Sequence, residues 1–216
     1  MNQKQKVIIL LGPPGSGKGT QGKELTQKLA IPHISTGDIF RAIIKGDSPL
    51  AERAKSFMNV GKLVPDELVI EIVAERLKQP DMAKGFMLDG YPRTIPQANA
   101  FAAQLGPEAE VIVINIQVPD EVIIQRISGR LSCPKCGAVY NKFFSPPKKE
   151  GYCDKCGTSL VQRPDDSADV VIERLKVYNN QTAPLISYYK DRGLLLNIDG
   201  NREPEIVLQD ILAQLK

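Results

Sequence analysis

The chain of 216 residues has one histidine, His33, and no tryptophan. A mechanism that depends on paired histidines is therefore excluded, and we expect His33 to be structural. No apolar stretch approaches the ~20 residues that span a bilayer, so a membrane partner is not expected. Residues 1–6 lead into a short apolar run without the apolar core and cleavage site of a signal peptide. We therefore expect a cytoplasmic location.

An excess of charge of one sign is also missing. The 28 lysines and arginines nearly balance the 25 acidic residues, and the formal net charge is +3. Whole-chain electrostatics therefore give no reason to expect a nucleic-acid partner. The hydrophobic content of 42% is enough for a real core. A chain of this length fits one large domain or one domain with small insertions.

Short apolar runs alternate with helical patterns along the chain. The runs are typical of strands buried on both faces of a parallel sheet, and residues 33–35 are expected to add a very short fifth strand. The runs cover residues 7–11, 85–89, 110–118 and 194–198. The helical patterns cover residues 17–30, 65–78, 96–105, 120–131, 169–191 and 203–215, and Pro184 should kink or interrupt the fifth. This order predicts an α/β fold with a doubly wound parallel sheet.

Two stretches depart from the alternation. Residues 36–64 have helical patterns without a convincing strand. Residues 132–164 are rich in Pro, Gly, Cys and Lys and poor in aliphatic side chains. We interpret both as insertions at the carboxyl side of the sheet, where ligands bind in such folds.

A glycine-rich turn follows the first apolar run. Residues 12–18 read GPPGSGK and have the full G-x-x-x-x-G-K spacing. Glycines permit positive φ, so consecutive backbone N–H groups can converge on one anion at the positive end of the next helix. Lys18 adds a mobile charge for the outer phosphates. The alternative is a tight turn with incidental glycines, which the complete spacing disfavours. The sequence therefore predicts a phosphate-binding loop.

Gly19 stands where the general loop pattern has a hydroxyl residue, and Thr20 follows it. This form, G-x-P-G-x-G-K-G-T, resembles the loop of the nucleoside monophosphate kinases, and of adenylate kinases in particular. Other stretches resemble motifs of that family in the same order: HISTGDIFR (33–41), GKLVPDELV (61–69), GFMLDGYPRTIPQA (85–98), QRISGR (125–130), QRPDDS (162–167) and ERLKVYNNQTAPLISYY (173–189).

The resemblance implies a monomeric kinase that transfers a phosphoryl group from Mg·ATP to AMP and gives two ADP. It implies a core of residues 1–34, 65–128 and 167–216, an AMP-binding insertion of residues 35–64, and a lid of residues 129–166. It also implies that Mg²⁺ is held largely through water, with Asp89, Asp165 and Asp166 nearby, so we do not assign a direct contact to Thr20. Helix N-capping is the alternative role for the last two aspartates.

The resemblance assigns further residues to the two nucleotides. The ATP-binding set is Gly15, Ser16, Gly17, Lys18, Gly19, Thr20, Arg126, Arg130, Val139, Tyr140 and Arg202. The AMP-binding set is Thr36, Arg41, Lys62, Leu63, Val64, Gly90, Arg93, Gln97, Arg163 and Arg174. Transfer itself is assigned to Lys18, Arg93, Arg130, Arg163 and Arg174.

Arginine suits a site that must grip phosphate oxygens, because its planar fork stays charged and forms two parallel bonds. Arg126 and Arg130 are four residues apart, which predicts one face of a helix end. A solvated helix face is the alternative for any single arginine, and we prefer it for Arg53, Arg76 and Arg192. The amide of Gln97 can pair with an adenine edge, whereas an ordinary surface glutamine is the alternative.

Four cysteines form two C-x₂-C pairs separated by sixteen residues: Cys133, Cys136, Cys153 and Cys156. Thiolates at this spacing can surround one Zn²⁺, and a structural zinc would stabilise an insertion too small to bury a core. Disulfides are disfavoured in a reducing cytosol, and iron fits the same ligands but is the less common structural metal.

Two other functions stay open on the sequence alone. The chain could be a kinase for another monophosphate, or one that uses GTP as donor. Alternatively, the cysteine segment, with its several lysines, could make the chain a nucleic-acid-binding ATPase.

Overall fold

The computed structural model describes residues 5–215. Residues 1–4 and 216 lie outside the described residues. They include part of the N-terminal segment for which no signal peptide is expected, and both ends of the expected core. Within the described part, no helix is long and apolar enough to cross a membrane.

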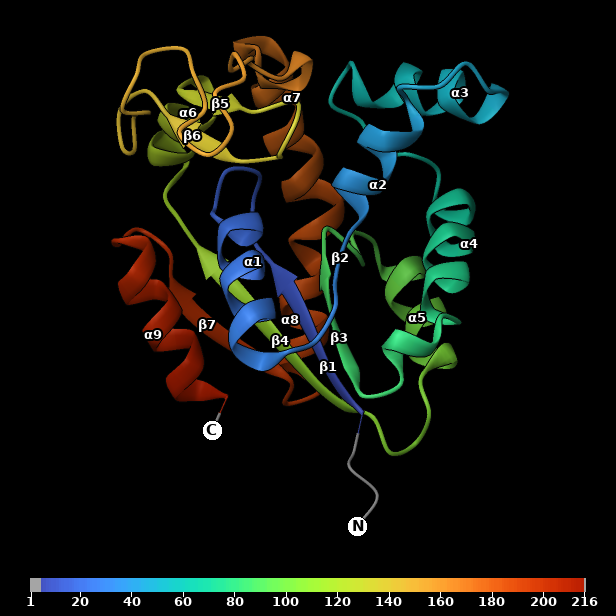
Figure 1. Cartoon of the computed structure of the whole chain (residues 1–216). Coiled ribbons are helices and arrows are strands. Elements are labelled where there is room, and N and C mark those ends of the chain that lie inside the picture. The colour runs from blue at the N-terminus through green and yellow to red at the C-terminus, as the bar shows by residue number, and fades with distance from the viewer. Residues whose placement is uncertain (1–4, 216) are drawn as a thin grey trace.

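Five parallel strands form the central sheet, in the order β2-β3-β1-β4-β7. They are β1 (Lys6–Leu11), β2 (His33–Ser35), β3 (Gly85–Asp89), β4 (Glu110–Gln117) and β7 (Leu195–Asp199). The sequence predicts the short strand β2, and the structure places it at one edge of the sheet. Because all five strands run the same way, their carboxyl ends meet at one edge of the sheet (Figure 1). The prediction of a doubly wound α/β fold is confirmed.

The strands are buried on both faces. In β1, Val7 and Ile9 belong to one apolar cluster, whereas Ile8 and Leu10 belong to the other. The helices α1 (Lys18–Leu29) and α9 (Pro204–Gln214) supply the second cluster. The first cluster is supplied by α2 (Thr36–Ile43), α3 (Pro49–Met58), α4 (Asp66–Leu77), α5 (Ile95–Gln104) and α8 (Pro184–Lys190). This two-sided burial explains why the strands read as continuous apolar runs.

Both departures from the alternation lie beyond the carboxyl edge of the sheet (Figure 1). Residues 36–64 form α2 and α3 without a strand. Ser35 and Ser48 cap these helices by accepting hydrogen bonds from Asp38 N and Ala51 N. The segment after α6 (Asp120–Ser128) forms a small antiparallel pair, β5 (Arg130–Ser132) and β6 (Val139–Asn141). Short 3₁₀ turns occur at Pro80–Met82 and Pro164–Asp166.

One expected helix is wrong in its extent. The pattern at 120–131 predicts a helix to Leu131, but α6 ends at Ser128 and Arg130 begins β5. Gly129 follows the helix, and its carbonyl accepts a hydrogen bond from Lys142 N. A side chain at Gly129 would meet the Phe143 ring at 2.7 Å. Tertiary pairing with β6 therefore overrides the helical pattern, and Arg126 and Arg130 do not share a helix face.

The pattern at 169–191 is interrupted, as Pro184 predicts. It forms α7 (Ala168–Val177), a π-helical turn (Tyr178–Thr182) and α8. The helix α7 packs on α6 through a small apolar cluster that contains Ile123, Ile127, Val171 and Leu175. The other helices and strands for which the sequence predicts a range begin and end within one or two residues of it.

Candidate active site

The glycine-rich loop connects β1 to α1 at the carboxyl edge of the sheet. Gly12 has φ of 139°, and a Cβ there would lie 2.5 Å from Ile116 O. Gly17 has φ of 99° and stands at the N-cap of α1. These positions require glycine, and they aim the first N–H groups of α1 into the loop.

Lys18 folds over this loop. Its Nζ donates hydrogen bonds to Gly12 O and Pro13 O, each at 2.7 Å. Burial lowers the pKa of Lys18 to about 8; the charge of Asp89 opposes this shift, whereas neighbouring arginines add to it. Gly19 and Thr20 are exposed at the start of α1.

Asp89 ends β3 beside the loop, because β1 and β3 are neighbours in the sheet. Asp89 Oδ2 lies 3.6 Å from His33 Nε2. The same oxygen would lie 3.6 Å from a Cβ atom if Gly19 carried a side chain. Burial raises the pKa of Asp89, but the nearby His33 and Lys18 lower it by more than burial raises it. The net shift of the pKa is downward, so this carboxyl group stays charged. The loop therefore has a largely buried carboxylate beside it, close enough to face a cation that accompanies a phosphate.

Three arginines and two aspartates form a cluster where the cysteine segment rejoins α7. The Arg130 guanidinium pairs with Asp166, which is fully buried. Arg174 donates to Asp165 Oδ2 at 2.8 Å and lies 3.4 Å from Asp166 Oδ1. Arg163 Nε donates to Ser132 Oγ at 2.9 Å. The two aspartates bind arginines here, and the N-cap of α7 is instead Ser167.

The cluster holds more positive charge than its carboxylates balance. Burial and the nearby Arg174 lower the pKa of Arg93 to about 10. Burial, Arg41 and Arg130 likewise lower the pKa of Arg163 to about 10. These guanidiniums repel one another across a partly dry site, so a bound anion would relieve the repulsion.

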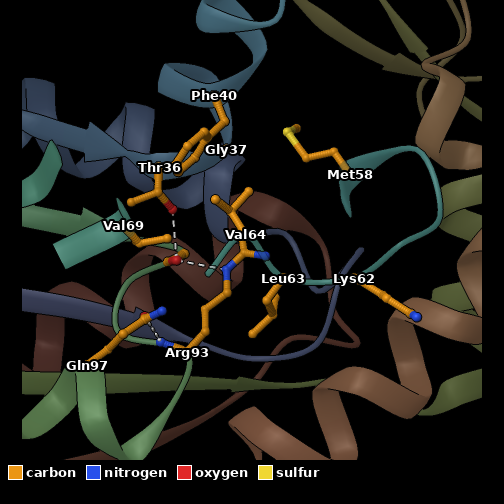
Figure 2. A pocket seen from close by; sticks show the side chains of 11 residues that line it. Thr36, Gly37, Phe40, Met58, Lys62, Leu63, Val64, Val69, Arg93 and Gln97 are labelled. Carbon is orange, nitrogen blue, oxygen red and sulfur yellow. Dashed lines mark hydrogen bonds between the residues drawn. The ribbon is translucent and has the colours of Figure 1, made fainter. Parts of the chain in front are cut away.

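A pocket between α2, α3 and the chain after β3 contains most of the expected AMP-binding residues (Figure 2). Its lining is Thr36, Gly37, Phe40, Met58, Lys62, Leu63, Val64, Val69, Gly90, Arg93 and Gln97. Arg41 is not in this lining, and its guanidinium pairs with Asp38 at 2.6 Å. The pocket is apolar at α2 and α3 and carries the partly buried guanidinium of Arg93 at the opposite side, which is suitable for a base and a phosphate.

Hydrogen bonds fix the polar side of this pocket (Figure 2). Gly90 O accepts from Thr36 Oγ1 at 2.8 Å and from Arg93 Nε at 2.7 Å. Gln97 Oε1 accepts from Arg93 N at 2.8 Å, and Gln97 Nε2 donates to Asp66 Oδ1 at 2.7 Å. Gln97 is buried, so the surface alternative for it is wrong. Its amide supports Arg93 and keeps one donor hydrogen and one lone pair free of these two bonds.

The expected donor-side residues are more dispersed. Arg126 Nη2 donates to Gly200 O at 2.9 Å, in the loop between β7 and α9. Arg202, from the same loop, pairs with Asp210 at 2.6 Å. Val139 is exposed on β6, and the adjacent Tyr140 hydroxyl lies 3.5 Å from Cys153 Sγ.

Sequence reasoning missed three supporting residues. Asp66 holds the Gln97 amide, Ser132 holds Arg163, and Thr182 donates to Arg93 O at 2.9 Å. Asp66 and Thr182 lie inside stretches quoted above as family motifs, but a motif does not say what a side chain contacts. Ser132 has no signal in the sequence beyond its place next to Cys133.

The four cysteine side chains meet at one point. Their sulfur atoms all lie within 4.8 Å of one another, and Cys133 Sγ lies 3.4 Å from Cys156 Sγ. Thiolates at ~2.3 Å from a tetrahedral zinc would lie about 3.8 Å apart. The four cysteines therefore form a possible metal site.

The two halves of this site have the same backbone. Gly137 N donates to Cys133 O at 3.0 Å, and Gly157 N donates to Cys153 O at 2.8 Å. Both glycines have φ near 70°, which a residue with a side chain rarely adopts. Each C-x₂-C-G stretch thus forms a tight knuckle that points its sulfurs inward, and the Tyr140 hydroxyl accepts from Asp154 N at 2.9 Å beside the second knuckle.

Comparison with known proteins agrees with this arrangement. The family model described as adenylate kinase matches residues 10–194. An adenylate kinase of Lachnoclostridium phytofermentans is 52% identical over 210 residues, covering 96% of this chain and 97% of the relative. One from Carboxydothermus hydrogenoformans is 52% identical over 211 residues, covering 97% and 99%. One from Methanosarcina acetivorans is 52% identical over 210 residues, covering 96% and 97%.

Proposed function

The chain belongs to the adenylate kinase family, and we propose that it transfers the γ-phosphoryl group of Mg·ATP to AMP reversibly, giving two ADP. The observation that carries the proposal is that positively charged side chains lie close together between the loop and the pocket. Beyond burial, the arginines Arg93, Arg130 and Arg174 lower the pKa of Lys18, although they come from three different parts of the chain. Such a site is built for several phosphates at once.

The pocket of Figure 2 is proposed to hold AMP. Its apolar side would receive the adenine, and the free donor and acceptor of Gln97 would contact the base edge. Arg93 would bind the AMP phosphate, and Arg41 would join it after leaving Asp38. Backbone groups of residues 62–64 would complete the base contact.

The loop is proposed to hold ATP. Its N–H groups would surround the β- and γ-phosphates, and Lys18 would exchange its bonds to Gly12 O and Pro13 O for phosphate oxygens. Arg126 would lie beside the donor adenine, at the junction of β6 and the loop after β7. Val139, Tyr140 and Arg202 complete the proposed donor set.

In the proposed step, an oxygen of the AMP phosphate attacks the γ-phosphorus in line, and the bond from this phosphorus to the ADP oxygen breaks. The attacking oxygen is already anionic, so no general base is needed. Arg130, Arg163 and Arg174 would bind the equatorial oxygens of the transferred group and spread its charge. In the structure these side chains are held by Asp166, Ser132 and Asp165.

Kinases of this family use Mg²⁺ with ATP, and the residues here fit such an ion. Asp89 is a largely buried, charged carboxylate beside the loop, and Asp165 lies among the arginines. We propose that these aspartates, with Asp166, orient water molecules of the ion. The ion would neutralise charge on the β- and γ-phosphates.

Two segments are proposed to close over the substrates before transfer: residues 35–64, which bind AMP, and residues 129–166, the lid. The core is then residues 1–34, 65–128 and 167–216. Closure would exclude water, which otherwise would accept the phosphoryl group and make the enzyme an ATPase.

The cysteine cluster of the lid is proposed to hold a structural zinc ion. All four donors are thiol sulfurs, and four protein ligands fill the tetrahedral coordination that is typical of structural zinc. Iron would fit the same sulfurs, and metal analysis of the purified protein decides between them. The monomeric state and the cytoplasmic location stay predictions.

A coupled assay for ADP formation, with AMP present and absent, tests the transfer. We expect Arg93→Ala to lose transfer by about 100-fold or more, because a charged group proposed to bind the AMP phosphate is removed. Arg53→Ala is the matched control, since Arg53 is exposed on α3. Unchanged transfer in Arg93→Ala would contradict the proposal.

The same assay separates the competing functions. Preference for GMP, CMP or UMP over AMP, or for GTP over ATP, would change the assigned substrate within the family. ATP hydrolysis that nucleic acid stimulates, without phosphorylation of AMP, would indicate that the cysteine segment reads nucleic acid instead.

A further inference from the structure

The helix that carries Arg174 is interrupted close to the proposed acceptor site. α7 ends at Val177, and the π-helical turn Tyr178–Thr182 follows. Ala183 N donates to Tyr178 O at 2.8 Å, five residues back. Pro184 explains the interruption, since it has no N–H for the helix and its ring crowds a carbonyl one turn earlier. Such turns often occur at functional sites, but the transfer described above gives this one no part.

One residue of the turn is buried. The side chains of Asn179, Asn180 and Gln181 are exposed, whereas Thr182 is only 7% exposed. Its Oγ1 donates a hydrogen bond of 2.9 Å to Arg93 O, 89 residues away in the sequence. A π-helical turn holds one residue more than an α-helical turn, so it changes which side chain faces the sheet. Here the buried side chain is a hydroxyl that meets the main chain of Arg93.

Arg93 is held at three points. Gln97 Oε1 accepts from its N–H at 2.8 Å, Thr182 donates to its carbonyl, and its Nε donates to Gly90 O at 2.7 Å. The first and third of these contacts are drawn in Figure 2. The two main-chain bonds fix the α-carbon from both sides, and the third bond directs the guanidinium. The outer nitrogens of Arg93 remain available for a phosphate.

We propose that Thr182 is a positioning residue for the phosphoryl acceptor. Its hydroxyl keeps Arg93 in the place where the guanidinium faces the AMP phosphate. The same turn follows the helix of Arg174, so the bond also fixes the spacing of the two guanidiniums, which repel each other. This inference rests on the proposed function, because it needs AMP as the ligand of Arg93.

Steady-state kinetics of three variants test the role. Thr182→Val keeps the shape and removes the donor, and we expect kcat/KM for AMP to fall about tenfold while KM for ATP stays within about twofold. Thr182→Ser restores a donor and should stay within about twofold of wild type in both constants. Tyr188→Phe is the matched control. It removes a 2.9 Å bond to Asn99 from the neighbouring helix α8 without touching Arg93, so neither constant should change.

Loss of kcat/KM for AMP in Thr182→Val, with recovery in Thr182→Ser, supports the inference. Equal losses for both substrates, unchanged kinetics, or a serine variant as poor as the valine variant would overturn it. If Thr182→Val does not fold, calorimetry on Thr182→Ala decides: weaker AMP binding with unchanged ATP binding supports the role, and any other result rejects it. A wild-type enzyme that forms no ADP from ATP and AMP would instead defeat the proposed function.

Discussion

The central sheet and the lid are built by different means, although both carry residues of the proposed site. The strands of the sheet bury side chains such as Ile9, Met87 and Ile114 almost completely. The lid, by contrast, exposes Phe143 and Phe144 and buries little besides two cysteines, Ser132 and Asp166. A region with a large core keeps its shape by itself, whereas a small one needs cross-links.

The difference bears on function. Lys18 and Asp89 lie on the loop and strand end of the rigid sheet, where ATP is proposed to bind. Arg130 and Arg163 lie near the two ends of residues 129–166, so they would move with the lid in the proposed closure. A lid whose internal order depends on its cysteines can close as one unit without disturbing the sheet.

The largest expected effect concerns the sheet. Phe86→Ala removes a ring that is 2% exposed and packs edge-to-face against Phe101, so we expect a loss of about 3–5 kcal/mol in the free energy of unfolding. Chemical denaturation measures it. The exposed Phe143→Ala is the control in the lid and should cost less than about 0.5 kcal/mol. Similar losses of unfolding free energy in both variants would show that the sheet does not depend on buried side chains more than the lid does.

Removal of the proposed lid metal should have the next largest effect. Strong chelation, or Cys153→Ser, should make the lid melt first and lower the melting temperature by about 5 °C, because it removes a cross-link worth ~2 kcal/mol or more. Calorimetry with and without chelator measures the shift. Chelator should have no further effect on Cys153→Ser, and an unaffected melting curve in wild type would contradict a structural metal.

Charge at the sheet's edge gives a pH-dependent test. The pKa of Lys18 is about 8 in the nucleotide-free protein, and bound phosphates favour its protonated form. Above about pH 8, ATP binding must therefore be accompanied by proton uptake, and affinity should fall by up to about tenfold per pH unit. Calorimetric titration between pH 7 and 10 measures this, with Lys18→Met as the control that lacks the slope. A flat profile in wild type would reject the assignment of Lys18.

The smallest expected effect concerns the support of a lid arginine. Ser132→Ala removes the acceptor of the Arg163 Nε hydrogen bond, and we expect kcat to fall about three- to tenfold with the fold intact. Ser132→Thr keeps a hydroxyl and should recover most of kcat. If the alanine variant keeps full activity, the position of Arg163 does not depend on this contact.

Much of the molecule could be predicted from sequence because its signals are local. The loop at 12–18 needs particular residues at fixed spacing, and buried parallel strands need continuous apolar runs. The extent of α6 could not be predicted, since the helix ends where Gly129 and β5 pair with Lys142 and β6. For the same reason, the spacing of Arg126 and Arg130 gave the wrong geometry.

The sequence by itself determined the class of the fold, the glycine-rich loop between β1 and α1, the family and the four cysteines of the possible metal site, since each of these depends on residue type and short-range spacing. Only the tertiary structure decided which partners hold the charged groups: Asp166 for Arg130, Ser132 for Arg163, and Gln97 and Thr182 for Arg93. These contacts join residues up to 89 positions apart. They depend on how strands and helices pack, and no local pattern in the chain encodes that.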